Sequence, residues 1–368
     1  MNIMNILRRP RAVGCEPVVD ERPLWLRRFG AAVERYIGAE RLGLVLALIA
    51  LSAFLGVWEP GKFLRPVNLM NIALAISVTG LVAIAETVVM ISGGLDVSVG
   101  AIVGLSSVCA AMAMVLTDAP LAGALASLSL DEPIYVTLHI TLHVIVGVLA
   151  GLLMGVVAGA VNGLLVTVGR MNPVITTLAT VSVFSGAAYI TTGGQAVGVI
   201  NDAFNSIGNG RVWGIPIPVL LLLVIAVVIG VFLSRTDIGR NVYAMGGNPA
   251  AARLAGINLD RYKLGIYVLC GLICGLAGVI TTARTNSGIP TTTQTDLNFQ
   301  AITAAVLGGT ALAGGKGTVV GTLLGVLIIG TLNNGMIILN VQTFYQMVAR
   351  GLLLIFAVLL QDWRLRQR

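Results

Sequence analysis

The chain has 368 residues, of which 57% are hydrophobic and only 11% are charged. Soluble domains are about a quarter charged, so this composition excludes a soluble fold and indicates an all-α membrane protein that crosses the bilayer many times. The net charge of +7 is not accompanied by interleaved aromatic and basic residues, so there is no sequence signal for nucleic acid.

The amino-terminal segment, residues 1–41, is rich in arginine and lacks the apolar core of a cleavable signal peptide. Short segments rich in arginine and lysine stay in the cytoplasm, so we expect this one to be cytoplasmic. Residues 24–37 could form a surface helix or belong to a disordered tail. We expect a membrane domain over 42–361, with a cytoplasmic loop at 236–263, and a cytoplasmic tail at 362–368.

A membrane helix needs about 20 apolar residues, and ten stretches approach or exceed that length. Their bounds are 42–58, 72–92, 97–117, 140–168, 173–191, 215–234, 263–283, 297–313, 318–338 and 343–361. An even number of spans returns the carboxyl terminus to the cytoplasm. The joint at 92–97 is so short that it could be a broken or re-entrant helix, which is tolerated only where it is buried or lines a cavity. We expect a loop outside the membrane at 117–139.

A glycine pattern recurs at a constant offset of 221 positions. Ser92-Gly93-Gly94, followed by Gly100 and Gly104, matches Ala313-Gly314-Gly315, followed by Gly321 and Gly325. Both copies join an inward span to an outward span, which predicts a parallel internal repeat with broken helices. Such repeats are typical of transporters. Chance alignment of glycines remains the alternative, because the chain holds 45 of them.

The fourth span has glycine at every fourth position from Gly147 to Gly163. A helix face made of such small residues lets two helix backbones approach closely in lipid. The pattern favours packing within the chain over packing against a second copy.

The loop 236–263 contains a short predicted helix. Asn248 can cap it, Pro249 suits its first position, and Gly256 suits its end. A helix of about two turns outside the bilayer is a candidate docking element for a soluble partner. The alternative is a solvated connector without a partner.

Polar residues within spans are costly in hydrocarbon and tend to face a cavity. Most of those present are neutral, which suits a path for a hydroxyl-rich solute better than a path for ions. The candidate path residues are Glu86, Asp96, Asn162, Asn172, Thr176, Gln300, Asn333 and Asn334. Capping of broken helices is the alternative role for Asp96, Asn172 and Asn333.

No catalytic set is visible. His139 and His143 lie one helical turn apart, but no third ligand has metal-site spacing, so we expect no metal site. The chain also lacks the GxxxxGK[ST] nucleotide-binding pattern, so any ATPase that drives transport must be another chain.

Four motifs together resemble the permease subunits of bacterial ATP-binding cassette (ABC) importers for monosaccharides of the ribose, xylose, arabinose and galactose type. They are ISGGLDVSVGAIVGL (Ile91–Leu105), NPVITTLAT (Asn172–Thr180), TDIGRNVYAMGGNPAAARLAGIN (Thr236–Asn258) and AVLGGTALAGGKGTVVGTLLG (Ala305–Gly325). Their order fits from about residue 42 to 361, and the match is poorest in the amino-terminal segment and at 117–139.

The resemblance implies a type II ABC importer fold in the bacterial inner membrane. It implies three kinds of protein partner: cytosolic ATPase subunits, a periplasmic sugar-binding protein, and a second permease copy or paralogue that forms a dimer. Membrane lipid would surround the spans. ATP and Mg would be bound by the ATPase, and this chain would bind no cofactor. The family's coupling-helix motif falls on Gly246, Gly247, Asn248, Pro249, Ala252, Leu254 and Gly256.

Three alternatives stay open. A permease for nucleosides or branched-chain amino acids would share the same architecture. A secondary transporter would need an intramembrane ion site, for which Glu86 and Asp96 are the candidates. An intramembrane enzyme would need convergent catalytic groups.

Overall fold

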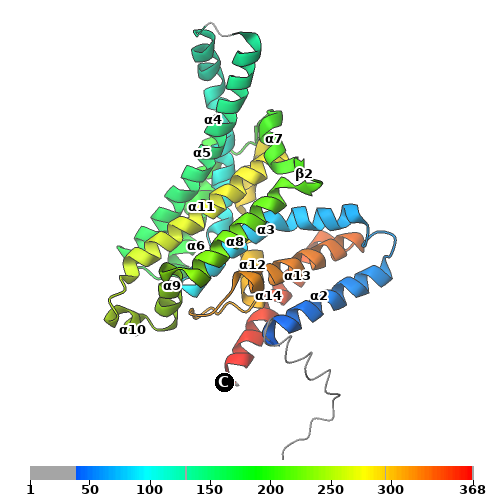
Figure 1. The fold of residues 1–368 in the computed structure, drawn as a ribbon, viewed down its shortest axis with the longest axis vertical. Helices are drawn as coiled ribbons and strands as arrows, with labels where there is room; N and C mark the ends of the chain where they lie inside the picture. The colour runs from blue at the N-terminus through cyan, green and yellow to red at the C-terminus, as the bar shows by residue number, and fades with distance from the viewer. Residues whose placement is uncertain (1–38, 129–130, 295, 367–368) are drawn as a thin grey trace, which may run out of the picture. The chain divides into compact units, whose positions relative to one another are not determined.

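The computed structural model describes residues 39–128, 131–294 and 296–366 (Figure 1). Residues 43–368 form one compact unit, whereas the predicted cytoplasmic segment lies almost wholly outside the described residues. The first helices are α2 (Ala39–Trp58), α3 (Pro66–Ile91), α4 (Val99–Ala126), α5 (Glu132–Thr167), α6 (Pro173–Thr192), α7 (Asp202–Asn209) and α8 (Ile217–Arg235). Those that follow are α9 (Asp237–Gly247), α10 (Pro249–Leu254), α11 (Leu259–Thr285), α12 (Leu297–Leu307), α13 (Val319–Ile338) and α14 (Thr343–Arg366).

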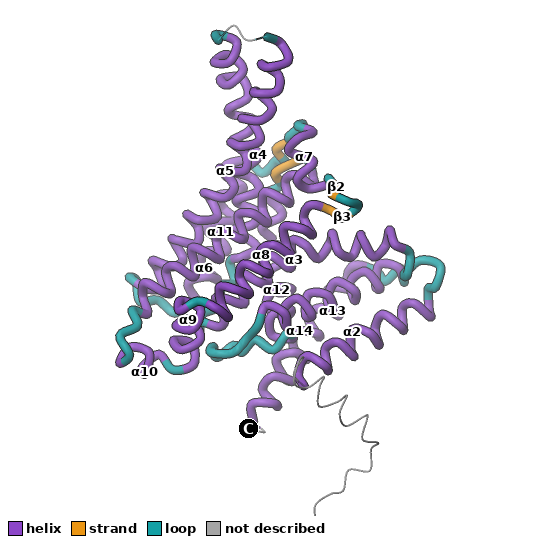
Figure 2. The backbone as a smooth tube through the Cα atoms, in the orientation of Figure 1, coloured by secondary structure: helices purple, strands orange, loops and turns teal. Residues whose placement is uncertain are grey.

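The all-α membrane fold predicted from composition is confirmed (Figure 2). Among the described residues, seven helices are long and apolar enough to cross a bilayer, and two shorter apolar stretches lie at 42–58 and 343–359. In the described part of the chain, strands are limited to two antiparallel pairs of two residues each. β1 (Val197–Gly198) pairs with β4 (Ser287–Gly288), and β2 (Arg211–Val212) pairs with β3 (Ile215–Pro216).

The glycine face of the fourth span packs within the chain, as the sequence favours. α5 lies along α11, where Gly155 and Gly159 face the backbone of Gly271, and Gly275 faces the carbonyl oxygen of Gly151. A β-carbon at Gly275 would come within 2.9 Å of that oxygen. The two backbones therefore touch without intervening side chains, which maximises van der Waals contact in lipid, where hydrophobic burial contributes little.

The expectation of a loop at 117–139 is wrong. α4 continues to Ala126 and α5 begins at Glu132, so the two helices form a hairpin whose turn is only a few residues long (Figure 1). The 36 residues of α5 would be about 54 Å long, well beyond the ~30 Å hydrocarbon core. Hydropathy delimits only the apolar part of such helices.

The eighth span does not have the predicted bounds of 297–313. α12 has only 11 residues, about 16 Å, and ends at Leu307 because the two glycines that follow turn the chain, the second with φ +89°. The eighth crossing begins before α12, in a segment that is not α-helical. Gly288 lies against Val108 and Ala111 of α4, and Asn298 donates its side-chain N–H to the carbonyl oxygen of Val97 at 3.2 Å.

The described residues between 287 and 298 therefore contact α4 near Ala111 at one end and the chain just before α4 at the other. They include β4 and a 3₁₀ turn, Pro290–Gln294. Irregular backbone at this depth is tolerated because it is buried against protein. α12 thus enters the bundle as a half-length helix.

Candidate functional site

The loop 236–263 contains the predicted short helix. α10 begins at Pro249, and the side chain of Asn248 accepts the N–H of Ala251 at 3.0 Å. Gly256, with φ +83°, ends the turn after it. Ala252 is buried, whereas Leu254 is 92% exposed. An exposed leucine on a capped helix gives the loop an apolar contact point.

A second helix in this loop, α9, was not predicted. Thr236 caps it by accepting the N–H of Gly239 at 3.0 Å, and Val242 and Met245 bury its inner face. Tyr243 donates its hydroxyl to the carbonyl oxygen of Gly317 at 2.8 Å. α9 is thus fastened to the segment between α12 and α13.

The end of α9 is where both halves of the repeat meet. Gly246 is buried, and a β-carbon there would overlap the carbonyl oxygen of Ile91 and lie 2.7 Å from the nitrogen of Gly315. Gly315 donates its N–H to the same Ile91 oxygen at 2.8 Å. Gly314, with φ +92°, would place a β-carbon 2.9 Å from Cα of Gly93. We call these five residues the glycine junction.

The two breaks occupy equivalent places in the repeat. α3 and α12 both run toward the glycine junction, and α4 and α13 both lead away from it. Ser98 precedes α4 and Thr318 precedes α13, a separation of 220 positions that matches the offset of the glycine pattern to within one residue. The parallel repeat with broken helices is therefore a structural feature.

Three of the predicted path residues form one buried polar cluster at the first break. Glu86, Asp96 and Asn162 are all 0% exposed. Asp96 accepts the N–H and the hydroxyl of Ser98 at 2.9 and 2.6 Å and donates its own N–H to Oε1 of Glu86 at 3.1 Å. Asn162 donates to the Ser98 hydroxyl at 2.7 Å. In this conformation the cluster holds the non-helical segment 92–98, and its exposure to a path stays a prediction.

Replacing Glu86 with leucine should destabilise the protein. The buried N–H of Asp96 would lose its acceptor, at a cost of about 1–3 kcal/mol. Glu86→Gln keeps a carbonyl oxygen at that position and should melt close to wild type. The thermal unfolding midpoints of the two variants in mild detergent measure the difference. A leucine variant more stable than the glutamine variant would mean that removing a buried carboxyl group outweighs the lost hydrogen bond.

The remaining predicted path residues lie elsewhere. Asn172 caps α6 by accepting the N–H of Val174 at 3.0 Å, and Thr176, itself buried, donates its hydroxyl to the carbonyl oxygen of Asn172. Asn334 and Asn68 exchange side-chain hydrogen bonds of 2.9 and 3.0 Å and tie α13 to α3. Asn333 donates its side-chain N–H to Oε1 of Gln300 at 3.4 Å, which joins α13 to α12.

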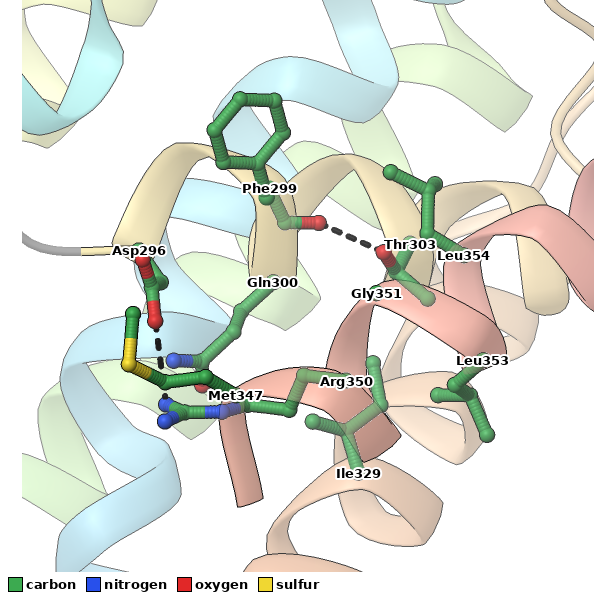
Figure 3. A pocket seen from close by; sticks show the side chains of 10 residues that line it. All are labelled: Asp296, Phe299, Gln300, Thr303, Ile329, Met347, Arg350, Gly351, Leu353 and Leu354. Atoms are coloured by element: carbon green, nitrogen blue, oxygen red, sulfur yellow. Dashed lines mark hydrogen bonds and ion pairs between the residues drawn. The ribbon is translucent and has the colours of Figure 1, made fainter. Parts of the chain in front are cut away.

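Gln300 lines a cavity of about 280 Å³ between α12, α13 and α14 (Figure 3). The guanidinium of Arg350 on α14 lies 3.5 Å from the carboxylate of Asp296, the residue before α12. The amide end of Gln300 lies beside this ion pair. Most of the remaining lining is apolar: Phe299, Ile329, Met347, Leu353 and Leu354.

Asp296 and Arg350 are not among the residues predicted from sequence, although Arg350 has a recognisable signal. Arg350 is a charged residue inside the predicted span 343–361, and intramembrane charges are uncommon and tend to be functional. Asp296 was not assigned because it precedes the predicted span 297–313.

In the described part of the chain, no group of three or more histidine, cysteine, aspartate or glutamate side chains could hold a metal ion. His143 instead contacts the carbonyl oxygen of Met114 at 2.5 Å, and His139 lies 3.5 Å from the carboxylate of Asp118. These contacts join α5 to α4.

Comparison with known proteins matches residues 68–358 to the family described as "Branched-chain amino acid transport system / permease component". The ribose import permease protein RbsC of Bacillus subtilis (strain 168) is 43% identical over 323 residues, which cover 87% of this chain and 92% of that protein. RbsC of Escherichia coli (strain K12) is 37% identical over 86% of this chain and 92% of its own length. The L-arabinose ABC transporter permease protein AraH of Azospirillum brasilense is 37% identical over 89% of both chains. No solved structure matches.

Proposed function

The chain belongs to the family "Branched-chain amino acid transport system / permease component". From its similarity to sugar permeases within that match, we infer that it is the membrane-spanning subunit of an ABC importer for a monosaccharide. The observation that carries this function is the near full-length similarity to ribose and arabinose permeases. The protein is a multi-pass protein of the inner membrane and a transport subunit of a system that also has ATPase and binding-protein partners.

We propose that ATP hydrolysis takes place on two cytosolic ATPase subunits that bind ATP and Mg, and that this chain binds no cofactor. Its domain plan would be the one predicted from sequence, with cytoplasmic segments at 1–41 and 362–368 around the membrane domain. The loop 236–263 carries Arg240, Arg253, Arg261 and Lys263, which favours the cytoplasm for α9 and α10. Both termini would then be cytoplasmic, and the α4–α5 hairpin would face the periplasm and the binding protein.

The exposed members of the seven coupling-motif residues would dock the ATPase, and the buried ones would hold the loop in place. Leu254 and Gly247 are exposed on the loop, while Gly246 contacts both repeat breaks. A displacement of α9 and α10 would therefore reach α3–α4 and α12–α13 together through the glycine junction. This arrangement supports alternating access, in which the ATPase cycle exposes the path to each side in turn.

A second permease copy or paralogue would complete the pathway, and lipid would cover the outward apolar faces. Leu223, Val227 and Val231 on α8 and Leu352, Phe356 and Leu359 on α14 are each about half exposed or more, which suits contact with hydrocarbon. Of the predicted path residues, Gln300 is the best placed, because it lines the cavity of Figure 3, and Asn333 donates a hydrogen bond to its side chain.

Uptake in proteoliposomes tests this function. The permease, purified with its ATPase, should import D-ribose or L-arabinose only when ATP is present with the ATPase and when the loaded binding protein is added. A proton ionophore should leave uptake unchanged. Uptake that collapses with the ionophore, in a preparation without an ATPase, would instead indicate a secondary transporter.

A further inference from the structure

The ion pair Asp296–Arg350 lies inside the membrane-spanning part of the bundle. Arg350 is seven residues into α14, about 10 Å from its start, on the apolar stretch 343–359. Ile329, which lines the same cavity, is in the middle of α13. Charged side chains at such depth are expensive and face a bundle interior or a water-filled cavity.

The ion pair is not sealed between helices. The side chains of Arg350 and Asp296 are 22% and 37% exposed, and both line the cavity. The amide of Gln300 lines the same cavity, and its Oε1 accepts a hydrogen bond of 3.4 Å from the side chain of Asn333. An ion pair that only held two helices together inside the membrane would be expected to be sealed from any cavity. Here charged and polar groups are left available to an occupant.

The chemistry of these groups matches hydroxyl groups better than ions. The guanidinium donates, the carboxylate accepts, and the amide of Gln300 does both, and each hydroxyl of an occupant can likewise donate and accept. The pair is neutral overall, so it supplies no net charge to hold a cation or an anion. The apolar lining, including the half-exposed ring of Phe299, suits the C–H surface of a sugar ring.

We propose that the cavity between α12, α13 and α14 is a binding site for a monosaccharide, whose hydroxyl groups exchange hydrogen bonds with Asp296, Arg350 and Gln300. This proposal rests on the importer function inferred above. A volume of about 280 Å³ is at the lower end of the range for small-ligand sites, which suits one sugar ring. The site adjoins the half-length helix α12, which ends at the break that reaches the glycine junction.

A cysteine at Gly351 gives a direct test of occupancy. Gly351 lines the cavity, and a β-carbon there meets no atom within 4 Å. In a background with the four native cysteines replaced by alanine, N-ethylmaleimide would label Gly351→Cys. Turnover with ATP and a D-ribose-loaded binding protein should slow this labelling relative to turnover without sugar. The matched control is Gly186→Cys on α6, which also has open space and lies outside the cavity lining, and its labelling should not respond to ribose.

Two substitutions test the polar groups. Arg350→Lys keeps the charge and the pairing with Asp296 but loses the planar fork of donors. Gln300→Leu removes an amide without touching the ion pair. Each should lower the ribose imported per ATP hydrolysed about tenfold, because hydrogen bonds to the sugar are lost, while the loaded binding protein still stimulates ATP hydrolysis. Gln342→Leu, on the turn before α14, is the matched control and should transport like wild type.

The outcomes separate the two proposals. If the wild-type complex imports no monosaccharide, the inferred function fails. If it imports ribose, but labelling at Gly351→Cys is insensitive to the sugar and both polar variants keep the wild-type ratio of ribose to ATP, the cavity is not the binding site and the importer function stands.

Discussion

Gly155→Leu is expected to prevent the permease from folding. A β-carbon at Gly155 would overlap the carbonyl oxygen of Gly271 and lie 2.7 Å from Cα of Gly275. Overpacking costs about 1–3 kcal/mol even where side chains can adjust, and here the obstacle is helix backbone. α5 and α11 would have to separate along their shared face, which is the main close backbone contact of both helices. Size-exclusion chromatography of a fluorescent fusion in mild detergent should show aggregate in place of the wild-type peak.

Gly186→Leu is the matched control, because Gly186 on α6 has no atom within 4 Å of a β-carbon and should accept leucine in lipid or detergent. Gly155→Ala should give an intermediate result, with folded protein of lowered melting temperature. A monodisperse Gly155→Leu protein that melts like wild type would show that the α5–α11 contact is not needed for the fold.

The sequence located helices best where a cap or a proline marks their start. The fifth span was predicted at 173–191 and α6 runs over Pro173–Thr192, because Asn172 and Pro173 fix its first turn. The ninth was predicted at 318–338 and α13 runs over Val319–Ile338, with Thr318 as its cap. α4 and α5 were predicted too short because their outer turns carry polar residues such as Asp118 and Thr137, which hydropathy excludes but a helix accepts.

Composition could not locate the eighth crossing. Residues 308–313 read GGTALA, which is apolar enough to extend a predicted span but contains the glycines that end α12. The preceding segment, 288–296, looks like an exposed polar loop in sequence, and only the contacts of Gly288 with α4 and of Asn298 with Val97 show that the chain enters the bundle here. Such long-range contacts have no local signature.

The candidate path residues were predicted because they are polar and lie within spans. Polarity alone does not distinguish a buried residue that stabilises the backbone from a residue that lines a cavity. Glu86, Asp96 and Asn162 satisfy the backbone and caps of a broken helix, whereas Gln300 lines an open cavity. The coupling loop was more predictable because its signals are local: a cap at Asn248, a proline at the first helical position and a glycine at the end. The contact of Gly246 with both repeat breaks is non-local and was not foreseen.

The largest effect on transport alone is expected from Gly247→Arg. Gly247 is exposed, its φ is not in the left-handed region, and the nearest atom to a β-carbon is Cα of Gly315 at 4.0 Å. An arginine can therefore be accommodated without refolding the loop. It would add bulk and positive charge at the entrance to α10, on the surface that we propose contacts the ATPase. Uptake in proteoliposomes should fall to background, while the complex continues to hydrolyse ATP without responding to the loaded binding protein.

Comparing Gly247→Arg with Gly246→Ala distinguishes a loss of ATPase docking from a loss of stability. A β-carbon at Gly246 would overlap the carbonyl oxygen of Ile91, so Gly246→Ala should disturb the glycine junction itself and lower the melting temperature. Gly247→Arg should melt like wild type and fail only in coupling. Gly61→Arg, in the turn before α3 with open space around it, controls for an added arginine and should transport normally. If Gly247→Arg also transports normally, the surface at the start of α10 does not carry the movement of the ATPase, and the burial of Gly246 would then serve only to hold the two breaks together.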